Sequence, residues 1–243
     1  MKFQTSYFSC PGTRENNEDW AAFSYKKHRS GVWAVADGLG GHLNGEIASR
    51  TAVDAAISTF LENPKVSSDN IIKVMEAANR AVWCKQGEEH GYDSMKTTLV
   101  AMFMCRGYAC FAHAGDSRLY LFRKNRIVFQ TRDHTVPQLM MENDKLPEGD
   151  VRFCEDRNQL LCALGAYNIV SADVTNKPIH LRRGDAVLMC TDGFWERVLE
   201  ERMEDTLSIS KSPEQWLSLM RFHLEKEKVE RQDNYTAMAV FVR

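Results

Sequence analysis

The middle of the chain, residues 97–131, reads TTLVAMFMCRGYACFAHAGDSRLYLFRKNRIVFQT. It contains short runs rich in apolar, β-branched and aromatic residues at 97–104, 108–114, 118–123 and 126–131. The segments that separate these runs are Cys105-Arg106-Gly107, Gly115-Asp116-Ser117 and Lys124-Asn125. Short apolar runs joined by turn residues in this way are typical of neighbouring antiparallel strands. The stretch therefore predicts an antiparallel β-meander.

The flanking segments add further strands and a smaller number of helices. Strand character is found at 3–9, 20–25, 31–37, 171–179, 184–193 and 235–242. Apolar residues at helical spacing predict helices over 45–61, 68–87 and 212–228, with one helical turn near 136–142 inside an irregular stretch at 132–158. Helices that occur singly or in pairs among many strands favour antiparallel sheets over a doubly wound parallel sheet. We expect an α+β fold, a β-sandwich with helices outside.

Composition and charge limit the functions open to this chain. It has 243 residues with no repeat or obvious linker, which predicts a single domain over 1–243. A formal net charge of −2 provides no polybasic surface, so neither nucleic acid nor a membrane is expected as a partner. No apolar stretch matches a signal peptide or a membrane span. The seven cysteines form no C-x-x-C pair and are expected to be reduced thiols, which predicts a cytoplasmic protein.

Acidic residues occur where the expected strands begin or end. Asp37 and Asp192 each follow an apolar strand and precede a glycine, which permits a sharp exit from the strand. The other acidic residues placed in this way are Glu18, Asp19, Asp116 and Asp233. Carboxylates gathered at one end of a sheet must take up protons or hold cations. Oxygen ligands alone select Mg²⁺ or Mn²⁺ rather than zinc, and two such ions about 3.5–4 Å apart can activate a water for attack on phosphorus.

Other interpretations of the same residues are weighed against this one. A single Asp-Gly is typical of a turn, and Asp116 taken alone is typical of a hairpin. The glycines of VADGLGGHLNG at 35–45 resemble a phosphate-binding loop, but Leu43 occupies the last glycine position of G-x-G-x-x-G, and G-K-[ST] is absent. No cysteine is followed six positions later by arginine, and D-x-D-x-[TV] does not occur. These absences argue against cysteine-dependent and phosphoaspartyl phosphatases.

Segments along most of the chain resemble, in order, the motifs of the metal-dependent PP2C-type (PPM) protein serine/threonine phosphatases, and their form is similar to the bacterial branch. They are GTRENNED (12–19), VADGLGGHLNGEIAS (35–49), TTLV (97–100), AGDSRLYL (114–121), RDHT (132–135), ALG (163–165), CTDGFWE (190–196) and DNYTAMAV (233–240). The resemblance implies a four-layer αββα sandwich of two antiparallel sheets flanked by helices. It also implies hydrolysis of phosphoserine and phosphothreonine by a water activated between two Mg²⁺ or Mn²⁺ ions.

The resemblance further implies metal-binding roles for Glu18, Asp19, Asp37, Gly38, Asp116, Asp192 and Asp233. Asp37 would bridge two ions, and Asp192 and Asp233 would complete the first site. Glu18 or Asp19, with the carbonyl of Gly38, would serve the second site, partly through waters. Asp116 together with Asp192 would match the weaker third metal site of bacterial members.

Roles in substrate binding and proton transfer are also implied. Arg14 matches a phosphate-binding guanidinium, and His42 matches a general acid that protonates the leaving oxygen. Residues 136–158 would form a flap beside the active site. One departure is the segment VERQDN, because glycine or serine commonly precedes the final Asp-Asn in the family. Trp195 is expected to pack under the metal-site loop.

Partners and alternatives complete the set of expectations. The substrates would be proteins phosphorylated on serine or threonine, a Ser/Thr kinase would act in opposition, and a monomer is expected. His113 is expected to be a packed strand residue, and Asp133-His134 a loop pair that orders the start of the flap. The alternatives are a pseudophosphatase that serves as a binding module and a two-metal phosphodiesterase. The presence of all the expected metal-site acids argues against the first, and the family motifs with a single arginine do not favour the second.

Overall fold

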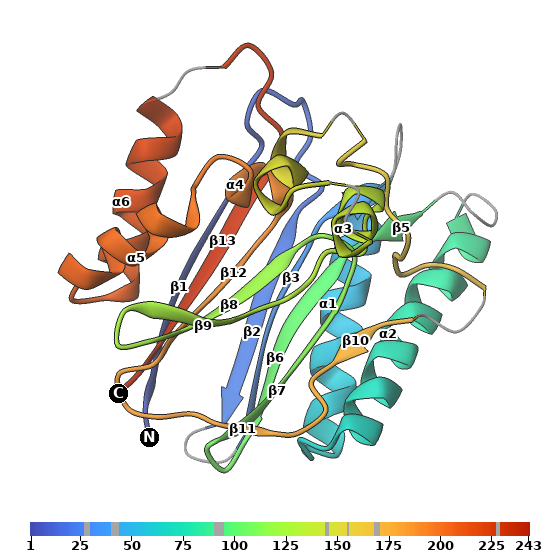
Figure 1. Cartoon of the computed structure of the whole chain (residues 1–243). Helices are drawn as coiled ribbons and strands as arrows, with labels where there is room; N and C mark the ends of the chain where they lie inside the picture. The colour runs from blue at the N-terminus through green and yellow to red at the C-terminus, as the bar shows by residue number, and fades with distance from the viewer. Residues whose placement is uncertain are drawn as a thin grey trace.

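The computed structural model describes residues 1–26, 30–39, 44–89, 95–143, 146–154, 156–167, 171–226 and 229–243. These residues form two antiparallel β-sheets packed face to face, with helices on the outer face of each sheet (Figure 1). The predicted α+β architecture, a four-layer αββα sandwich, is confirmed. None of the helices in these ranges is long and apolar enough to cross a membrane.

One sheet joins the two ends of the described chain. Its strand order is β1 (Phe3–Cys10), β13 (Tyr235–Val242), β12 (Ala186–Cys190), β8 (Arg118–Arg123) and β9 (Arg126–Gln130). The pairing of β1 with β13 runs from Phe3 opposite Val242 to Cys10 opposite Tyr235. Helices α5 (Glu200–Ile209) and α6 (Pro213–Lys226) cover the outer face of this sheet (Figure 1).

The other sheet carries the second pair of helices. Its strand order is β10 (Asp173–Val174), β7 (Tyr108–Ala114), β6 (Leu99–Cys105), β3 (Ser30–Ala36) and β2 (Trp20–Lys26), and β11 (Ile179–His180) also pairs with β7. A short ladder joins β4 (Gly38–Leu39) to β5 (Lys96–Thr97). Helices α1 (Gly45–Glu62) and α2 (Ser68–Glu89) pack on the outer face of this sheet.

The inner strands of this sandwich are buried on both faces, which explains why they are continuous apolar runs in the sequence. Along β6, Leu99, Ala101 and Phe103 belong to the core under α1 and α2. Val100 and Met102 belong to the core between the two sheets. Because successive strand residues point to opposite faces, both sets must be apolar when helices cover one face and a second sheet covers the other.

The predicted meander is wrong at one connection. Strands β6 and β7 form one hairpin and β8 and β9 another, but β8 pairs with β12 and β9, not with β7. Residues 115–117 therefore carry the chain from one sheet to the other, through Gly115 at a φ of 101°. Asp116 consequently lies at the end of the sandwich and not in a hairpin turn.

Other elements differ from expectation in smaller ways. The strand predicted over 171–179 is replaced by the two short strands β10 and β11. Neither α4 (Asp192–Trp195) nor α5 follows from the sequence pattern, and the buried residues of α5 are only Met203, Thr206 and Leu207. Within the stretch predicted as irregular, the helical turn is α3 (Val136–Glu142), and a 3₁₀ helix at Glu148–Phe153 follows it.

Candidate active site

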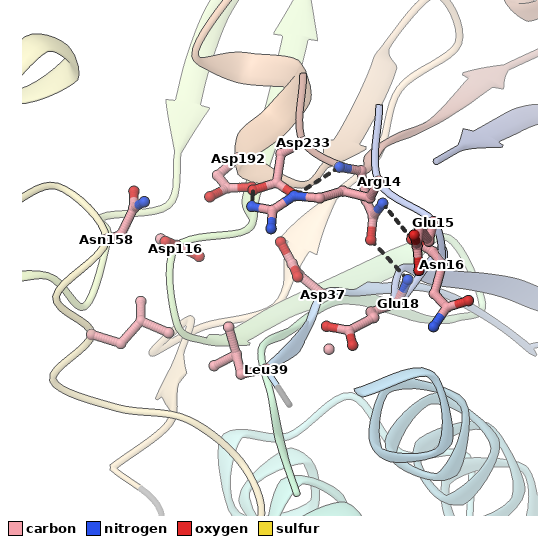
Figure 2. Close-up of a pocket in the computed structure, with 13 residues that line it drawn as sticks. Arg14, Glu15, Asn16, Glu18, Asp37, Leu39, Asp116, Asn158, Asp192 and Asp233 are labelled. Atoms are coloured by element: carbon pink, nitrogen blue, oxygen red, sulfur yellow. Dashed lines mark hydrogen bonds and ion pairs between the residues drawn. The ribbon is translucent and has the colours of Figure 1, made fainter. Parts of the chain in front are cut away.

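Predicted acidic residues from five separate segments of the chain line one cavity of about 620 Å³ at the end of the sandwich (Figure 2). These residues are Glu18, Asp37, Asp116, Asp192 and Asp233. Arg14 and Gly38 line the same cavity, as do Asn158, at the end of the flap segment, and Leu160 just after it. The structure thus brings together most of the predicted site. Of the remaining two residues, Asp19 is buried next to the site, and His42 lies outside the described residues.

Two neighbouring threonines hold the backbone of Asp37. The Asp37 N–H donates to Thr98 Oγ1 at 2.9 Å, and the Asp37 carbonyl accepts from Thr98 N–H and from Thr97 Oγ1 at 2.8 Å each. Thr98 Oγ1 also lies 2.7 Å from Ser117 Oγ, in the loop that carries Asp116. The motif TTLV gave no role to either threonine, because these bonds join segments about 60 residues apart.

The two Asp-Gly pairs depend on glycine for a different reason from the predicted sharp exit. A Cβ at Gly38 would lie 2.2 Å from the carbonyl oxygen of Gly45, and one at Gly193 would lie 2.1 Å from that of Asn234. Neither glycine has a positive φ. Both positions therefore require glycine because another backbone segment approaches too closely for any side chain.

Asn234 fastens the loop that carries Arg14 and Glu18. Its side-chain oxygen accepts from the Glu18 N–H at 2.8 Å, and its amide donates to the carbonyls of Pro11 and Asn16 at 2.9 Å each. Asn234 is buried and follows Asp233 directly. One side chain thus fixes the first loop of the chain against the last.

Gln232, the residue that departs from the common family pattern, is accommodated within this site. It is buried, and its backbone exchanges hydrogen bonds with Thr13 at 2.9 and 3.0 Å. Its side-chain amide donates to the carbonyl of Gly193 at 3.1 Å. The larger residue therefore connects the loops around Asp192 and Asp233 instead of distorting them.

Burial and mutual repulsion raise the pKa of several carboxyl groups. The pKa of Asp37 lies well above its ordinary value because of burial and the nearby charges of Asp19 and Asp192. Burial, followed by the charge of Asp192, likewise raises the pKa of Asp116. The pKa of Asp192 rises to about 6, mainly through burial. Without cations, these groups would hold protons at a pH where exposed carboxyl groups are ionised.

Asp19 contributes a further observation. Its Oδ2 accepts from Thr191 Oγ1 at 2.9 Å, whereas its Oδ1 is buried with no hydrogen-bond partner among the described residues. Burial raises the pKa of Asp19 to about 8. An unpartnered buried carboxylate oxygen is costly unless a ligand satisfies it.

The cavity therefore fits divalent cations. Its donor groups are carboxylate oxygens, which suit Mg²⁺ and Mn²⁺. Arg14 carries the only positive charge among the described residues that line it. Arg14 Nη2 donates to Asp233 Oδ2 at 2.9 Å (Figure 2). Bound cations could therefore balance the carboxylate charges that Arg14 alone does not.

Trp195 packs under the Asp116 loop, as predicted. Its indole N–H donates to the carbonyl of Asp116 at 2.9 Å. The Arg118 guanidinium lies 3.4 Å from the centre of a Trp195 ring and forms a two-bond pair with Asp133 at 2.9 and 2.7 Å. A buried network thus supports the Asp116 loop.

An αββα sandwich with carboxylates and one arginine gathered at its end defines the class of PP2C-like metal-dependent phosphatases. The chain belongs to the protein phosphatase 2C family, whose model matches residues 9–232. It is 30% identical over 204 residues to the serine/threonine phosphatase stp of Listeria welshimeri. The aligned residues cover 82% of this chain and 80% of that protein.

Solved structures agree with this assignment. The serine/threonine phosphatase PstP/Ppp of Mycobacterium tuberculosis superposes with a TM-score of 0.82 at 26% identity, over 99% of both chains. The catalytic domain of PstP in complex with two manganese ions gives a TM-score of 0.80 at 26% identity, again over 99% of both chains. The predicted family, bacterial PP2C-type phosphatases, is confirmed.

Proposed function

We propose that this chain is a metal-dependent protein phosphatase that hydrolyses phosphoserine and phosphothreonine. The observation that carries the proposal is the convergence of Glu18, Asp37, Asp192 and Asp233 with Arg14 in one cavity. The name of the Listeria relative and the manganese ions bound to the PstP catalytic domain support the same activity and cofactor. The alternative of a pseudophosphatase is not favoured, because the predicted metal-site acids are all present.

The acidic residues would hold the cations. Asp37, Asp192 and Asp233 form the first proposed site, Glu18 or Asp19 with Asp37 and the Gly38 carbonyl form the second, and Asp116 with Asp192 forms a weaker third. When bound, Mg²⁺ or Mn²⁺ lowers the pKa of water and offsets the charge of the phosphoryl group. The raised carboxyl pKa values mean that cations and protons compete for these oxygens.

Arg14 would bind the phosphoryl group. Its side chain is 63% exposed, and a planar guanidinium can donate two parallel hydrogen bonds to phosphate oxygens. Its partner here, Asp233, is itself a proposed metal ligand. A cation at Asp233 would weaken this ion pair and leave the guanidinium available to the substrate.

Substitution of the central carboxylates tests the proposal. We expect Asp37→Asn and Asp192→Asn each to lower phosphopeptide hydrolysis with Mn²⁺ by more than about 100-fold. Even substitution of residues that only hydrogen-bond to metal ligands reduces metal affinity or activity about 10–100-fold. Asp54→Asn, the same change on the exposed face of α1, should have no effect. Release of phosphate from a phosphothreonine peptide is the measurement. Activity that survives a chelator would contradict the proposal, and Mn²⁺ binding without hydrolysis would favour the binding module.

His42 is proposed as the general acid. We expect His42→Ala to slow hydrolysis of phosphoserine peptides by about 10²–10⁴-fold, because their alkoxide leaving group needs a proton. An aryl phosphate, whose leaving group is a weaker base, should be affected much less. Comparison of kcat for the two substrates is the measurement, and equal losses would remove this role.

Cellular context forms the last part of the proposal. A Ser/Thr kinase would add the phosphates that this chain removes, and the chain would act as a single-domain monomer in the cytoplasm. The absence of a membrane-crossing helix in the described ranges is compatible with this setting. Sedimentation of the purified chain tests whether it is a monomer. Deletion of its gene should raise protein phosphothreonine in the cell, and additional loss of the opposing Ser/Thr kinase should reverse that rise.

A further inference from the structure

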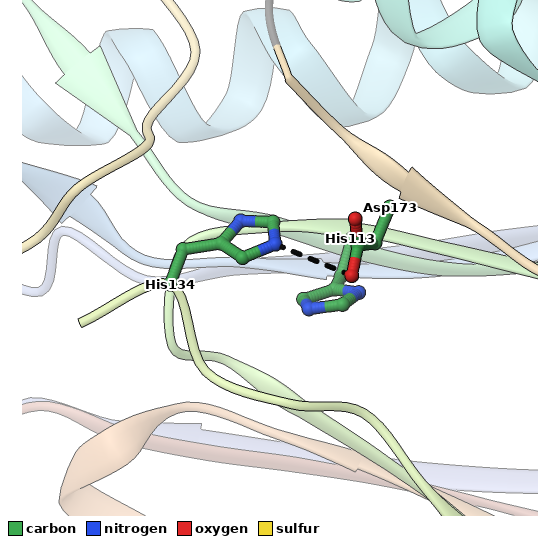
Figure 3. A group of neighbouring side chains, drawn as sticks. All are labelled: His113, His134 and Asp173. Carbon is green, nitrogen blue, oxygen red and sulfur yellow. Dashed lines mark ion pairs between the residues drawn. The ribbon is translucent and has the colours of Figure 1, made fainter. Parts of the chain in front are cut away.

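A second group of metal-ligating side chains lies next to the Asp116 loop, outside the carboxylate cavity. It consists of His113 on β7, His134 after β9 and Asp173 on β10 (Figure 3). Each residue offers one ligand atom, and these atoms all lie within 4.8 Å of one another. His134 Nε2 is 3.6 Å from Asp173 Oδ2, and the two imidazole rings stack with centroids 4.5 Å apart. We propose that these three residues bind a divalent transition-metal ion.

The donor atoms differ in kind from those of the carboxylate cavity. Two imidazoles and one carboxylate suit Zn²⁺, Co²⁺ or Ni²⁺, whereas Mg²⁺ prefers oxygen ligands and water. Three protein ligands leave the remaining coordination positions to water. The chain would therefore hold two kinds of metal site with different selectivity.

His113 is oriented as a ligand requires. Its Nε2 lies 2.6 Å from the carbonyl oxygen of Arg132, which can only accept a hydrogen bond. Nε2 therefore carries the proton, and Nδ1 keeps its lone pair for an ion. A metal-ligating histidine commonly donates its other N–H to a carbonyl in this way, which fixes the ring. His113 is also buried, with 4% of its surface exposed.

An ion can reach the cluster from solvent. The side chain of Asp173 is 66% exposed. An open cavity of about 540 Å³, lined in part by His113 and Asp173, leads to the cluster. The site thus combines one buried ligand, one half-buried ligand and one exposed carboxylate.

Binding would affect the neighbouring Asp116 loop. The backbone N–H of Gly115 donates to the imidazole Nδ1 of His134 at 3.3 Å. The backbone N–H of His134 donates in turn to the Gly115 carbonyl at 3.0 Å. Coordination through Nε2 requires the tautomer with a proton on Nδ1, which can no longer accept from Gly115. An ion at the cluster would therefore break a hydrogen bond one residue from Asp116. Coupling of this kind is reciprocal, so ions in the two sites should weaken each other.

Cobalt absorption tests the site without any activity measurement. The full chain, saturated with Mg²⁺, is titrated with Co²⁺, because nitrogen-ligated Co²⁺ of low coordination number absorbs visible light more strongly than octahedral Co²⁺ with oxygen ligands. In the wild type we expect one equivalent of Co²⁺ to bind with strong visible absorption. In His134→Gln and Asp173→Asn we expect the Co²⁺ affinity of this site to fall at least about 10-fold. His180→Gln, at an exposed position on β11 of the same sheet, is the matched control.

Asp173→Asn keeps the test decisive, because Asp173 is exposed and its substitution should not impair folding. Zn²⁺ should displace the Co²⁺ signal and shift the imidazole NMR resonances of His113 and His134, but not those of His180. Weak absorption of the octahedral type in the wild type, or equal affinity in the wild type and both variants, would overturn the proposal.

Discussion

Thr98 is a buried residue between two of the loops that carry proposed metal ligands. Its hydroxyl accepts from the Asp37 N–H at 2.9 Å and contacts Ser117 Oγ at 2.7 Å. Its methyl group occupies the space that a side chain at Gly115 would need, since a Cβ there would lie 2.6 Å from Thr98 Cγ2. A single side chain thus sets the spacing between the Asp37 and Asp116 loops.

We expect Thr98→Val to lower the free energy of unfolding by about 1–3 kcal/mol, because it leaves the buried Asp37 N–H without an acceptor. It should also weaken Mn²⁺ binding, because the position of Asp37 is less defined. Thr98→Ser keeps the hydroxyl and should have the smaller effect on Mn²⁺ affinity. Urea unfolding and Mn²⁺ titration are the measurements. A loss of Mn²⁺ affinity in Thr98→Ser with affinity retained in Thr98→Val would contradict the prediction and assign the effect to the methyl group.

Supporting residues of this kind are the part of the site that sequence patterns do not reveal. Glu18, Asp37, Asp116, Asp192 and Asp233 were recognisable because each stands at the end of an apolar strand or within a motif. Asn234 bonds Glu18, and Gln232 bonds Thr13, across more than 200 positions of the chain. Hydrogen bonds of this kind leave no recognisable pattern in the sequence, because the two partners lie far apart along the chain.

At the scale of elements, the flap segment is tied to the outer helices. Arg152, in the 3₁₀ helix, donates to both carboxylate oxygens of Glu200 at 2.8 and 2.7 Å, and Tyr120 donates to the same carboxylate at 2.9 Å. Glu200 begins α5. The chain that leaves this 3₁₀ helix continues to Asn158 and Leu160 in the cavity wall. The ion pair therefore connects a helix of the outer layer to the rim of the site.

We expect Arg152→Ala to raise KM for a phosphoprotein several-fold while changing kcat/KM for a small aryl phosphate little. The reason is that the proposed flap would contact a large substrate more than a small one, whereas the proposed metal ligands would serve both. Arg126→Ala is the control, because it removes an arginine–glutamate pair with the same helix, Arg126–Glu204, that involves no residue of the flap. Steady-state kinetics on both substrates is the measurement. A parallel loss on both would place the effect in the cavity itself.

The same scale shows where sequence patterns stop being informative. The hairpins at 99–114 and 118–130 follow from strong β-runs and short turns, and the helices on 45–62 and 68–89 follow from their apolar spacing. Gly115-Asp116-Ser117 fits a hairpin turn equally well, and only the distant partner strand β12 decides that it crosses between sheets. Helix α5 was missed because its few buried residues produce no clear helical period.

For the whole molecule, the crowded carboxyl groups predict how stability depends on pH. The pKa values of Asp37, Asp116, Asp192 and Asp19 are all raised in the folded chain, to about 6 for Asp192 and about 8 for Asp19. The metal-free folded state therefore binds more protons than the unfolded state between pH about 4 and about 8. Stability must fall as pH rises through this window.

We expect urea unfolding in chelator to give a lower free energy of unfolding at pH 8 than at pH 5. Mn²⁺ should stabilise the chain increasingly over the same range, because cations replace the protons that the carboxylates release. Asp37→Asn should flatten the pH dependence, since it removes one raised carboxyl and lessens the repulsion on its neighbours. Stability that rises from pH 5 to pH 8 without metal would contradict this prediction.

The pairing of β1 with β13 has a consequence for how the protein is made. Synthesis on the ribosome proceeds toward the C-terminus, so β1 emerges before the other described strands and β13, which lies beside it, emerges after them. Residues up to 234 must be available before Asn234 can fasten the loop of Arg14 and Glu18. Pairing two strands that lie so far apart in the sequence is slow, and the apolar surface of β1 stays exposed until β13 pairs with it. A nascent chain therefore lacks the complete proposed metal site, and the activity that would depend on it, until β13 has been added.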